Sequence, residues 1–148
     1  MTKIESFFAS RINMGLLFMR LIVGVIFFLH GIMKFNMGIN MTADFFTQAN
    51  IPAALLFAWI VTLVETFGGL ALILGVATRI VSLLLIITMF VSILVIVHFG
   101  MPLISTQTAT GYELNLALIA ALIPILILGP GRYSLAKYII TNEQQHTY

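Results

Sequence analysis

Cysteine is absent from this 148-residue chain, and charged residues make up only 8% of it. The first absence excludes disulfide exchange, thiolate nucleophiles, iron–sulfur ligation and covalent haem attachment through this chain. The second excludes an ordinary soluble domain, in which about a quarter of the residues are charged. Hydrophobic residues make up 61% of the sequence. The composition therefore predicts an integral membrane protein in which residues 1–148 form one membrane domain.

Basic residues are also few, with seven Lys and Arg against five Asp and Glu and a formal net charge of +2. They are spread along the chain, so they form no patch that could follow a nucleic-acid backbone. We therefore predict no nucleic-acid partner. The basic residues are more informative about membrane topology, because Lys and Arg collect in short cytoplasmic loops.

Four long apolar runs account for most of the chain. A helix needs about 20 apolar residues to cross the hydrocarbon core of a bilayer, which is about 30 Å thick. The runs are continuous rather than alternating, which favours helices over strands. They span residues 14–35, 53–76, 80–99 and 113–128. The predicted fold is all-α, an integral membrane four-helix bundle.

The connections between these runs contain recognisable helix signals. Thr42 is a plausible N-cap for a short interfacial helix at about 42–50, which would end before Pro52. The sequence GPG at 129–131 breaks the last helix and leaves residues 132–148 as a tail.

Topology follows from the Lys and Arg residues outside the apolar runs. They occur before the first run, between the second and the third, and after the fourth: Lys3, Arg11, Arg79, Arg132 and Lys137. This distribution predicts that both termini, and hence the tail, are cytoplasmic. The loop that contains Asp44 and the Ser/Thr-rich loop before the fourth run would face outward.

One face of the first run carries both charge and glycine. At about 100° per residue, a stripe of roughly 80° contains Arg20, Gly24, Phe27, Gly31 and Lys34, with His30 about 40° from Lys34. Glycines allow close helix contact and charges avoid lipid. We therefore expect this face to point into the bundle.

Glu65 occupies the middle of the second run, on a face shared with Gly68 and Gly69. A carboxylate at this depth must be protonated or paired. Counting about 1.5 Å per residue places Arg20 about 9 Å and Glu65 about 16 Å from the cytoplasmic end, a gap that an arginine can bridge. The sequence thus predicts a buried Arg20–Glu65 pair, either structural or engaged in holding an anion or a proton.

A second set of polar residues lies toward the outer ends of the runs. We predict a ligand-binding pocket lined by His30, Lys34, His98, Tyr112 and Glu113, with Asp44 covering it. Each member also has a simpler explanation, such as an interfacial Lys or a first-turn acid. Haem held by His30 and His98 is less favoured because His98 lies nearer the surface than His30. Zinc held by these histidines and Glu113 is less favoured because their spacing is not specific for a metal. We predict no metal site.

Four stretches of the chain, within about residues 17–136, carry a family resemblance. They are RLIVGVIFFLHGIMKF, VETFGGLALILGVATR, GYELNLALIAAL and GPGRYSL. Together they resemble the DoxX/DoxD-like family of small four-helix membrane proteins. The family name comes from subunits of an archaeal thiosulfate–quinone oxidoreductase, and some bacterial relatives are linked to membrane oxidoreductase complexes. The resemblance implies a plasma (inner) membrane location in a bacterium or archaeon.

Three functions stay open at this point. The first is a membrane subunit of an oxidoreductase complex, whose outward-facing pocket binds a quinone head group or a small anion. No redox cofactor is encoded, so an oxidoreductase partner, soluble or in the membrane, would supply the electrons. The alternatives are a non-catalytic assembly or anchoring protein and a component of a small-solute transporter, which with four spans would need a homo-oligomer.

Overall fold

The computed structural model describes residues 3–136, and these form five helices and no strand. The helices are α1 (Lys3–Met37), α2 (Ile39–Gln48), α3 (Ala54–Leu74), α4 (Thr78–His98) and α5 (Glu113–Leu128). The prediction of an all-α fold is confirmed for this part of the chain. Residues 137–148 of the predicted tail lie outside it.

Three of these helices are long and apolar enough to cross a membrane. They are Arg11–Met37 of α1, together with α3 and α4. The fourth apolar helix, α5, has 16 residues and is shorter. Large hydrophobic side chains cover the outside of the helices, including Ile22, Phe67 and Ile80, each more than 60% exposed. This apolar exterior is what a lipid-facing surface requires.

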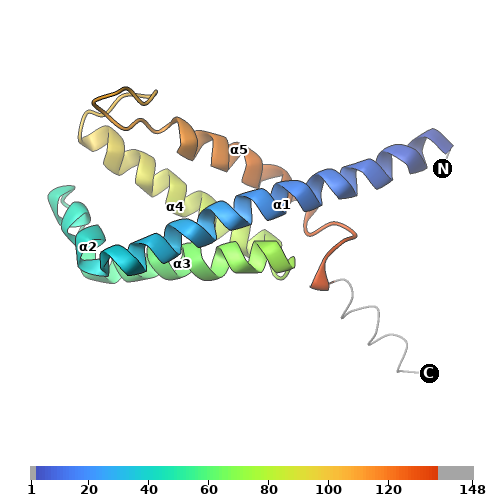
Figure 1. Cartoon of the computed structure of the whole chain (residues 1–148), viewed down its shortest axis with the longest axis horizontal. Coiled ribbons are helices and arrows are strands. Elements are labelled where there is room, and N and C mark those ends of the chain that lie inside the picture. The colour runs from blue at the N-terminus through green and yellow to red at the C-terminus, as the bar shows by residue number, and fades with distance from the viewer. Residues whose placement is uncertain (1–2, 137–148) are drawn as a thin grey trace, which may run out of the picture.

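The four apolar helices form a closed ring in which each contacts two others: α1 with α3, α3 with α4, α4 with α5, and α5 with α1. Figure 1 shows that α1 and α3 run side by side, while the α4–α5 pair diverges from them toward the end where α2 lies. The centre is filled by Val23, Phe27, Met89 and five Leu or Ile side chains: Leu72, Leu85, Leu118, Leu122 and Ile125.

Glycines allow α1 and α3 to pack at close range. A Cβ on Gly69 would lie 2.4 Å from the backbone nitrogen of Phe28, and one on Gly24 would lie 2.8 Å from the carbonyl oxygen of Gly69. A Cβ on Gly31 would lie 2.1 Å from Thr66 Oγ1. The glycine-bearing face of α1 therefore points inward, as predicted, and these glycines set the register of α1 against α3.

Replacing Gly31 by alanine is expected to lower the free energy of unfolding by about 1–3 kcal/mol, the usual cost of overpacking a close contact. The new methyl group would also lie 2.7 Å from the backbone nitrogen of Thr66, so the two helices would have to separate. Gly15→Ala is the matched control, because a Cβ at Gly15 meets no atom within 4 Å. Thermal unfolding in detergent would measure both variants. Equal stability of the two would contradict a steric role for Gly31.

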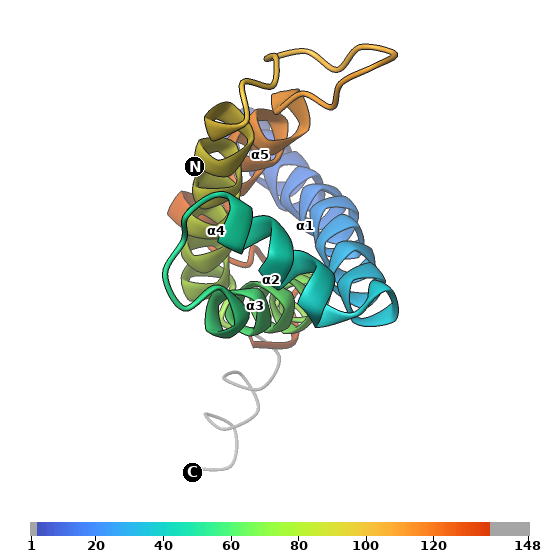
Figure 2. The ribbon, with the colours of Figure 1, turned by 90° about the vertical axis from the view of Figure 1, so that its left-hand side faces the viewer.

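α2 lies across one end of the bundle, in front of the ends of α1, α3 and α4 (Figure 2). Its buried Ala43 and Phe46 pack with Ala58 of α3, and the ring of Phe45 lies 5.0 Å from the ring of Phe99. The helix begins at Ile39, three residues before the predicted N-cap. The sharp turn from α1 occurs instead at Gly38, whose φ of 90° is accessible to glycine.

The opposite end of the bundle is closed by the segment that follows α5. Arg20 donates hydrogen bonds to the carbonyl oxygens of Pro130 and Tyr133, the latter at 2.8 Å. The backbone N–H of Arg132 donates to Asn13 Oδ1 at 2.8 Å, and Arg79 donates to the Ile127 carbonyl at 3.3 Å. Two arginines thus hold carbonyls at and beyond the end of α5, where cations are favoured.

Candidate functional site

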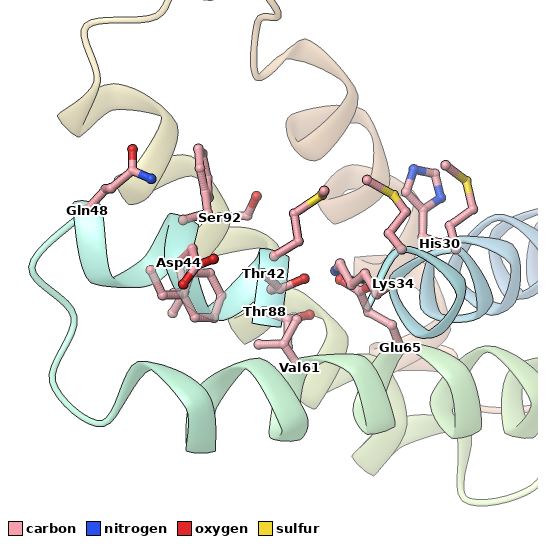
Figure 3. A pocket seen from close by; sticks show the side chains of 15 residues that line it. His30, Lys34, Thr42, Asp44, Gln48, Val61, Glu65, Thr88 and Ser92 are labelled. Carbon is pink, nitrogen blue, oxygen red and sulfur yellow. Dashed lines mark hydrogen bonds and ion pairs between the residues drawn. The ribbon is translucent and has the colours of Figure 1, made fainter. Parts of the chain in front are cut away.

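A cavity of about 640 Å³ lies beneath α2, between α1, α3 and α4 (Figure 3). Its apolar lining includes Met33, Met37, Phe46, Val61 and Val91. Polar side chains reach it from all four helices: His30 and Lys34, Thr42, Asp44 and Gln48, Glu65, and Thr88 and Ser92. A mostly apolar cavity with a few convergent polar groups is the usual form of a small-molecule site.

The strongest polar contact in the cavity is an ion pair between Lys34 and Glu65. Lys34 Nζ donates to Glu65 Oε2. The Glu65 side chain is 3% exposed, whereas that of Lys34 is 26% exposed. Glu65 therefore depends on its partner for the stability of its charge, while Lys34 keeps part of its ammonium group accessible to a ligand.

The predicted Arg20–Glu65 pair is wrong. Both side chains are buried, at 2% exposure each, but the glycine contacts place Gly31 opposite Thr66 and Arg20 opposite Gly75. Arg20 is thus level with the end of α3, about 15 Å along the helix from Glu65 at 1.5 Å per residue. The same register brings Lys34 level with Glu65. Depths counted from the ends of apolar runs could not reveal this offset.

His30 lies at the edge of the cavity, apart from the Lys34–Glu65 pair (Figure 3). Its Nδ1 lies 2.8 Å from the Ile26 carbonyl oxygen. A carbonyl can only accept, so Nδ1 carries the proton and Nε2 of the neutral ring is an acceptor. Nε2 can therefore accept a proton, but His30 is exposed and lies at the rim of the cavity, not on the buried face that the sequence predicted.

Three of the predicted pocket residues lie elsewhere. The Glu113 carboxylate accepts a hydrogen bond from the backbone of Ser105 at 3.0 Å, and the backbone N–H of Tyr112 donates to Leu103 at 3.1 Å. Both residues hold the loop before α5 and do not line the cavity. His98 lines a neighbouring cavity instead. The α4–α5 pair diverges from α1 and α3 toward this end of the bundle, which the periodicity of a single helix does not report (Figure 1).

Sequence reasoning assigned the wrong residue of α4 to the cavity, His98, and missed the two polar residues that do line it. Thr88 and Ser92 both line the cavity, and Thr88 Oγ1 donates to the Leu85 carbonyl at 2.8 Å, which leaves its oxygen free to accept. A signal was present in the sequence. Thr78, Ser82, Thr88 and Ser92 are small polar residues at helical spacing in an otherwise apolar run, which is typical of an inward face.

The charges that line the cavity do not favour an anion. Lys34 is the single permanent cation among its lining residues; it is paired with the carboxylate of Glu65, and Asp44 adds a second carboxylate to the lining. No group of three His, Asp or Glu side chains within residues 3–136 is close enough together to hold a metal ion. The donors and acceptors that remain suit a neutral ligand with polar atoms.

The fold and the cavity define a helical membrane protein with a ligand-sized cavity under α2. The chain belongs to the DoxX family, which it matches over residues 15–99. The family resemblance of the sequence is thereby confirmed.

Two bacterial relatives illustrate this membership. The chain is 36% identical over 84 residues to a Bacillus subtilis (strain 168) protein named "Putative oxidoreductase CatD", an alignment that covers 57% of this chain and 60% of that relative. It thus spans less than two thirds of the relative's length. The chain is 30% identical over 125 residues to "Uncharacterized membrane protein Rv3486" of Mycobacterium tuberculosis, covering 80% of this chain and 77% of the relative. No solved structure matches the chain significantly.

Proposed function

We propose that this protein is a membrane subunit of an oxidoreductase complex and that the cavity beneath α2 binds a quinone head group. One observation carries the proposal: an ion pair, Lys34–Glu65, lies in a cavity of about 640 Å³ in which apolar side chains alternate with a few polar ones. A quinone needs such a slot, with polar groups only at its two carbonyls. The name of the Bacillus subtilis relative supports a redox role.

A quinone fits the charges of the cavity better than the small anion that the sequence left open. An anion would meet the carboxylates of Glu65 and Asp44 and would find the ammonium of Lys34 already paired. A neutral quinone carbonyl only needs a donor, and an ammonium has three N–H groups. Lys34 can therefore keep its ion pair with Glu65 and still donate a hydrogen bond to the ligand.

The chain's own residues would bind the head group and handle protons. Lys34 donates to one carbonyl oxygen, while Glu65 and His30 Nε2, both proton acceptors at rest, take up protons from water and pass them to the two oxygens as they become hydroxyls. Reduction of a quinone to a quinol takes up two electrons and two protons. A protein partner with its own redox cofactor supplies the electrons in this proposal.

The proposed topology has four spans, with α5 as the fourth, and both termini in the cytoplasm. Arg11, Arg79 and Arg132 lie toward one end of the bundle, and α2 and the loop before α5 lie at the other (Figure 1). The positive-inside rule then places α2 and the cavity at the outer face. Passage of a solute is disfavoured, because the buried core around Phe27, Leu85 and Leu122 fills the bundle on the cytoplasmic side of the cavity.

Lys34→Met is expected to weaken quinone binding by roughly 10- to 100-fold, the loss of one hydrogen bond from a charged donor. Binding would be measured by quenching of Trp59 fluorescence in nanodiscs, with circular dichroism to verify folding. Arg79→Met removes a cation at the far end of the bundle and is the control, for which unchanged affinity is expected. Equal affinity of the wild type and Lys34→Met would contradict the proposed site.

A further inference from the structure

A second cavity, of about 510 Å³, adjoins the first on the side of α3 and α4. Four residues line both cavities: Phe46, Val61, Thr88 and Val91. Phe46 comes from α2 and is buried, at 7% exposure, so its ring lies where the two spaces meet. The two cavities are therefore neighbouring compartments with a common wall.

The second cavity differs from the first in chemistry. Its lining includes Phe57, Ile60, Ile87 and Leu94, and it contains neither a Lys, Arg, Asp nor Glu residue. These four side chains are also 42–55% exposed on the outside of the bundle. The second cavity is thus an apolar groove that reaches the surface of α3 and α4, which faces lipid in the proposed topology.

We infer that the ligand has a hydrocarbon tail, that the tail occupies this groove, and that the ligand enters sideways from the bilayer between α3 and α4. The inference rests on the proposed quinone site, since it places the head group in the first cavity. A polar compartment that adjoins an apolar groove matches an amphiphile, whose two parts differ in the same way. A water-soluble ligand has no apolar part that could occupy the groove.

The groove also explains how a ligand can reach a site that α2 covers. Phe45 packs on Phe99, just after α4, and Phe46 packs on Ala58 of α3, so α2 stays in place over its side of the first cavity. Entry through the groove requires only that the Phe46 side chain rotate away from the common wall. Phe46 is therefore the residue that separates the two compartments.

The test compares two probes, 2,3-dimethoxy-5-methyl-1,4-benzoquinone and its 6-decyl derivative, on three proteins in nanodiscs. Ala49 lines only the groove, and Ala49→Trp would fill it. We expect this variant to lose at least 10-fold in affinity for the decyl quinone and to bind the tail-less quinone as the wild type does. Leu63→Trp, on a separate lipid-facing hollow of α3 and α4, is the matched control and should leave both affinities unchanged.

Photo-crosslinking on the unaltered chain provides a second readout that does not depend on the folding of a variant. A decyl quinone with a diazirine at the end of its tail should label the α3 and α4 segments 57–61 and 87–98. Two results would overturn the inference and leave the proposed quinone site unaffected. One is labelling confined to α1 or α5, and the other is an Ala49→Trp variant that binds both probes as the wild type does. Failure of the wild type to bind either probe would overturn the proposed function itself, and the tail assignment with it.

Discussion

Arg20→Met is expected to lower the free energy of unfolding by about 3–5 kcal/mol, because a hydrogen bond from a charged donor contributes about 1.5–3 kcal/mol and Arg20 makes two. Its guanidinium donates to the carbonyls of Pro130 and Tyr133, and the side chain is 2% exposed. Methionine would preserve much of the apolar stem but would leave both carbonyls without their donor. Equilibrium unfolding of the detergent-solubilised protein, followed by circular dichroism, would measure the loss.

The physical reason for this large effect lies in the end of α5. Helix C-termini leave carbonyl groups without intrahelical partners, and Gly129 and Gly131, both with positive φ, turn the chain back toward α1. Arg20 connects that turned segment to the middle of α1. Its loss would release the segment from the bundle as well as removing two hydrogen bonds.

Arg79→Met is the control for this prediction. Arg79 makes a single, longer hydrogen bond of 3.3 Å to Ile127 in an exposed setting. Its replacement should cost no more than about 1 kcal/mol. Similar losses in the two variants would show that general positive charge at this end of the bundle, and not the buried Arg20 contacts, is what stabilises the fold.

Lys34→Met is expected to be the second most damaging change and to lower the free energy of unfolding by about 2–4 kcal/mol. This loss is somewhat smaller than the usual cost of breaking a buried ion pair, because Lys34 is partly exposed. It leaves the carboxylate of Glu65, 3% exposed, without its partner. Glu65→Leu should cost less, since a long lysine side chain can extend toward the interface. The two changes together, Lys34→Met/Glu65→Leu, should restore stability to within about 1 kcal/mol of the wild type, because no charge is then left unpaired.

This double-mutant cycle also separates a structural role of the pair from a role in binding. The double variant is expected to be stable and unable to bind quinone. If it bound quinone normally, the pair would serve only to fix the register of α1 and α3, as the assembly hypothesis requires. Additive losses in the two single variants would instead refute the pairing itself.

Much of the local structure was predictable, because it depends on the order of residues along one helix. The apolar runs predicted helices, and the 3.6-residue period predicted the inward face of α1, where Gly24, Phe27 and Gly31 are indeed buried. The break at GPG was also predicted correctly, since α5 ends at Leu128. The start of α2 was wrong, because Gly38 determines it and the sequence offered Thr42 as a more conventional cap.

The site was harder to predict than the helices. His30, Lys34 and Glu65 were recognised as candidates and all line the cavity. Three other candidates have similar polar side chains and a similar predicted depth but lie outside the cavity: Tyr112, Glu113 and His98. Depth along a helix gives only an approximate level across the bundle, and it carries no information on which helices diverge.

The sequence by itself determined that this chain is an apolar helical membrane protein of the DoxX family, with its charges turned inward on α1 and α3. Composition and periodicity suffice for the helices and their inward faces, since a lipid environment leaves the backbone few alternatives to a helix. The family followed from the resemblance of its motifs and from the family match over residues 15–99. Only the tertiary structure decided that Glu65 pairs with Lys34 and that Arg20 binds the loop after α5. The glycines at 24, 31 and 69 fix that register because they allow the backbones of α1 and α3 into contact. The register between two helices depends on both of them, so neither segment of the sequence determines it alone.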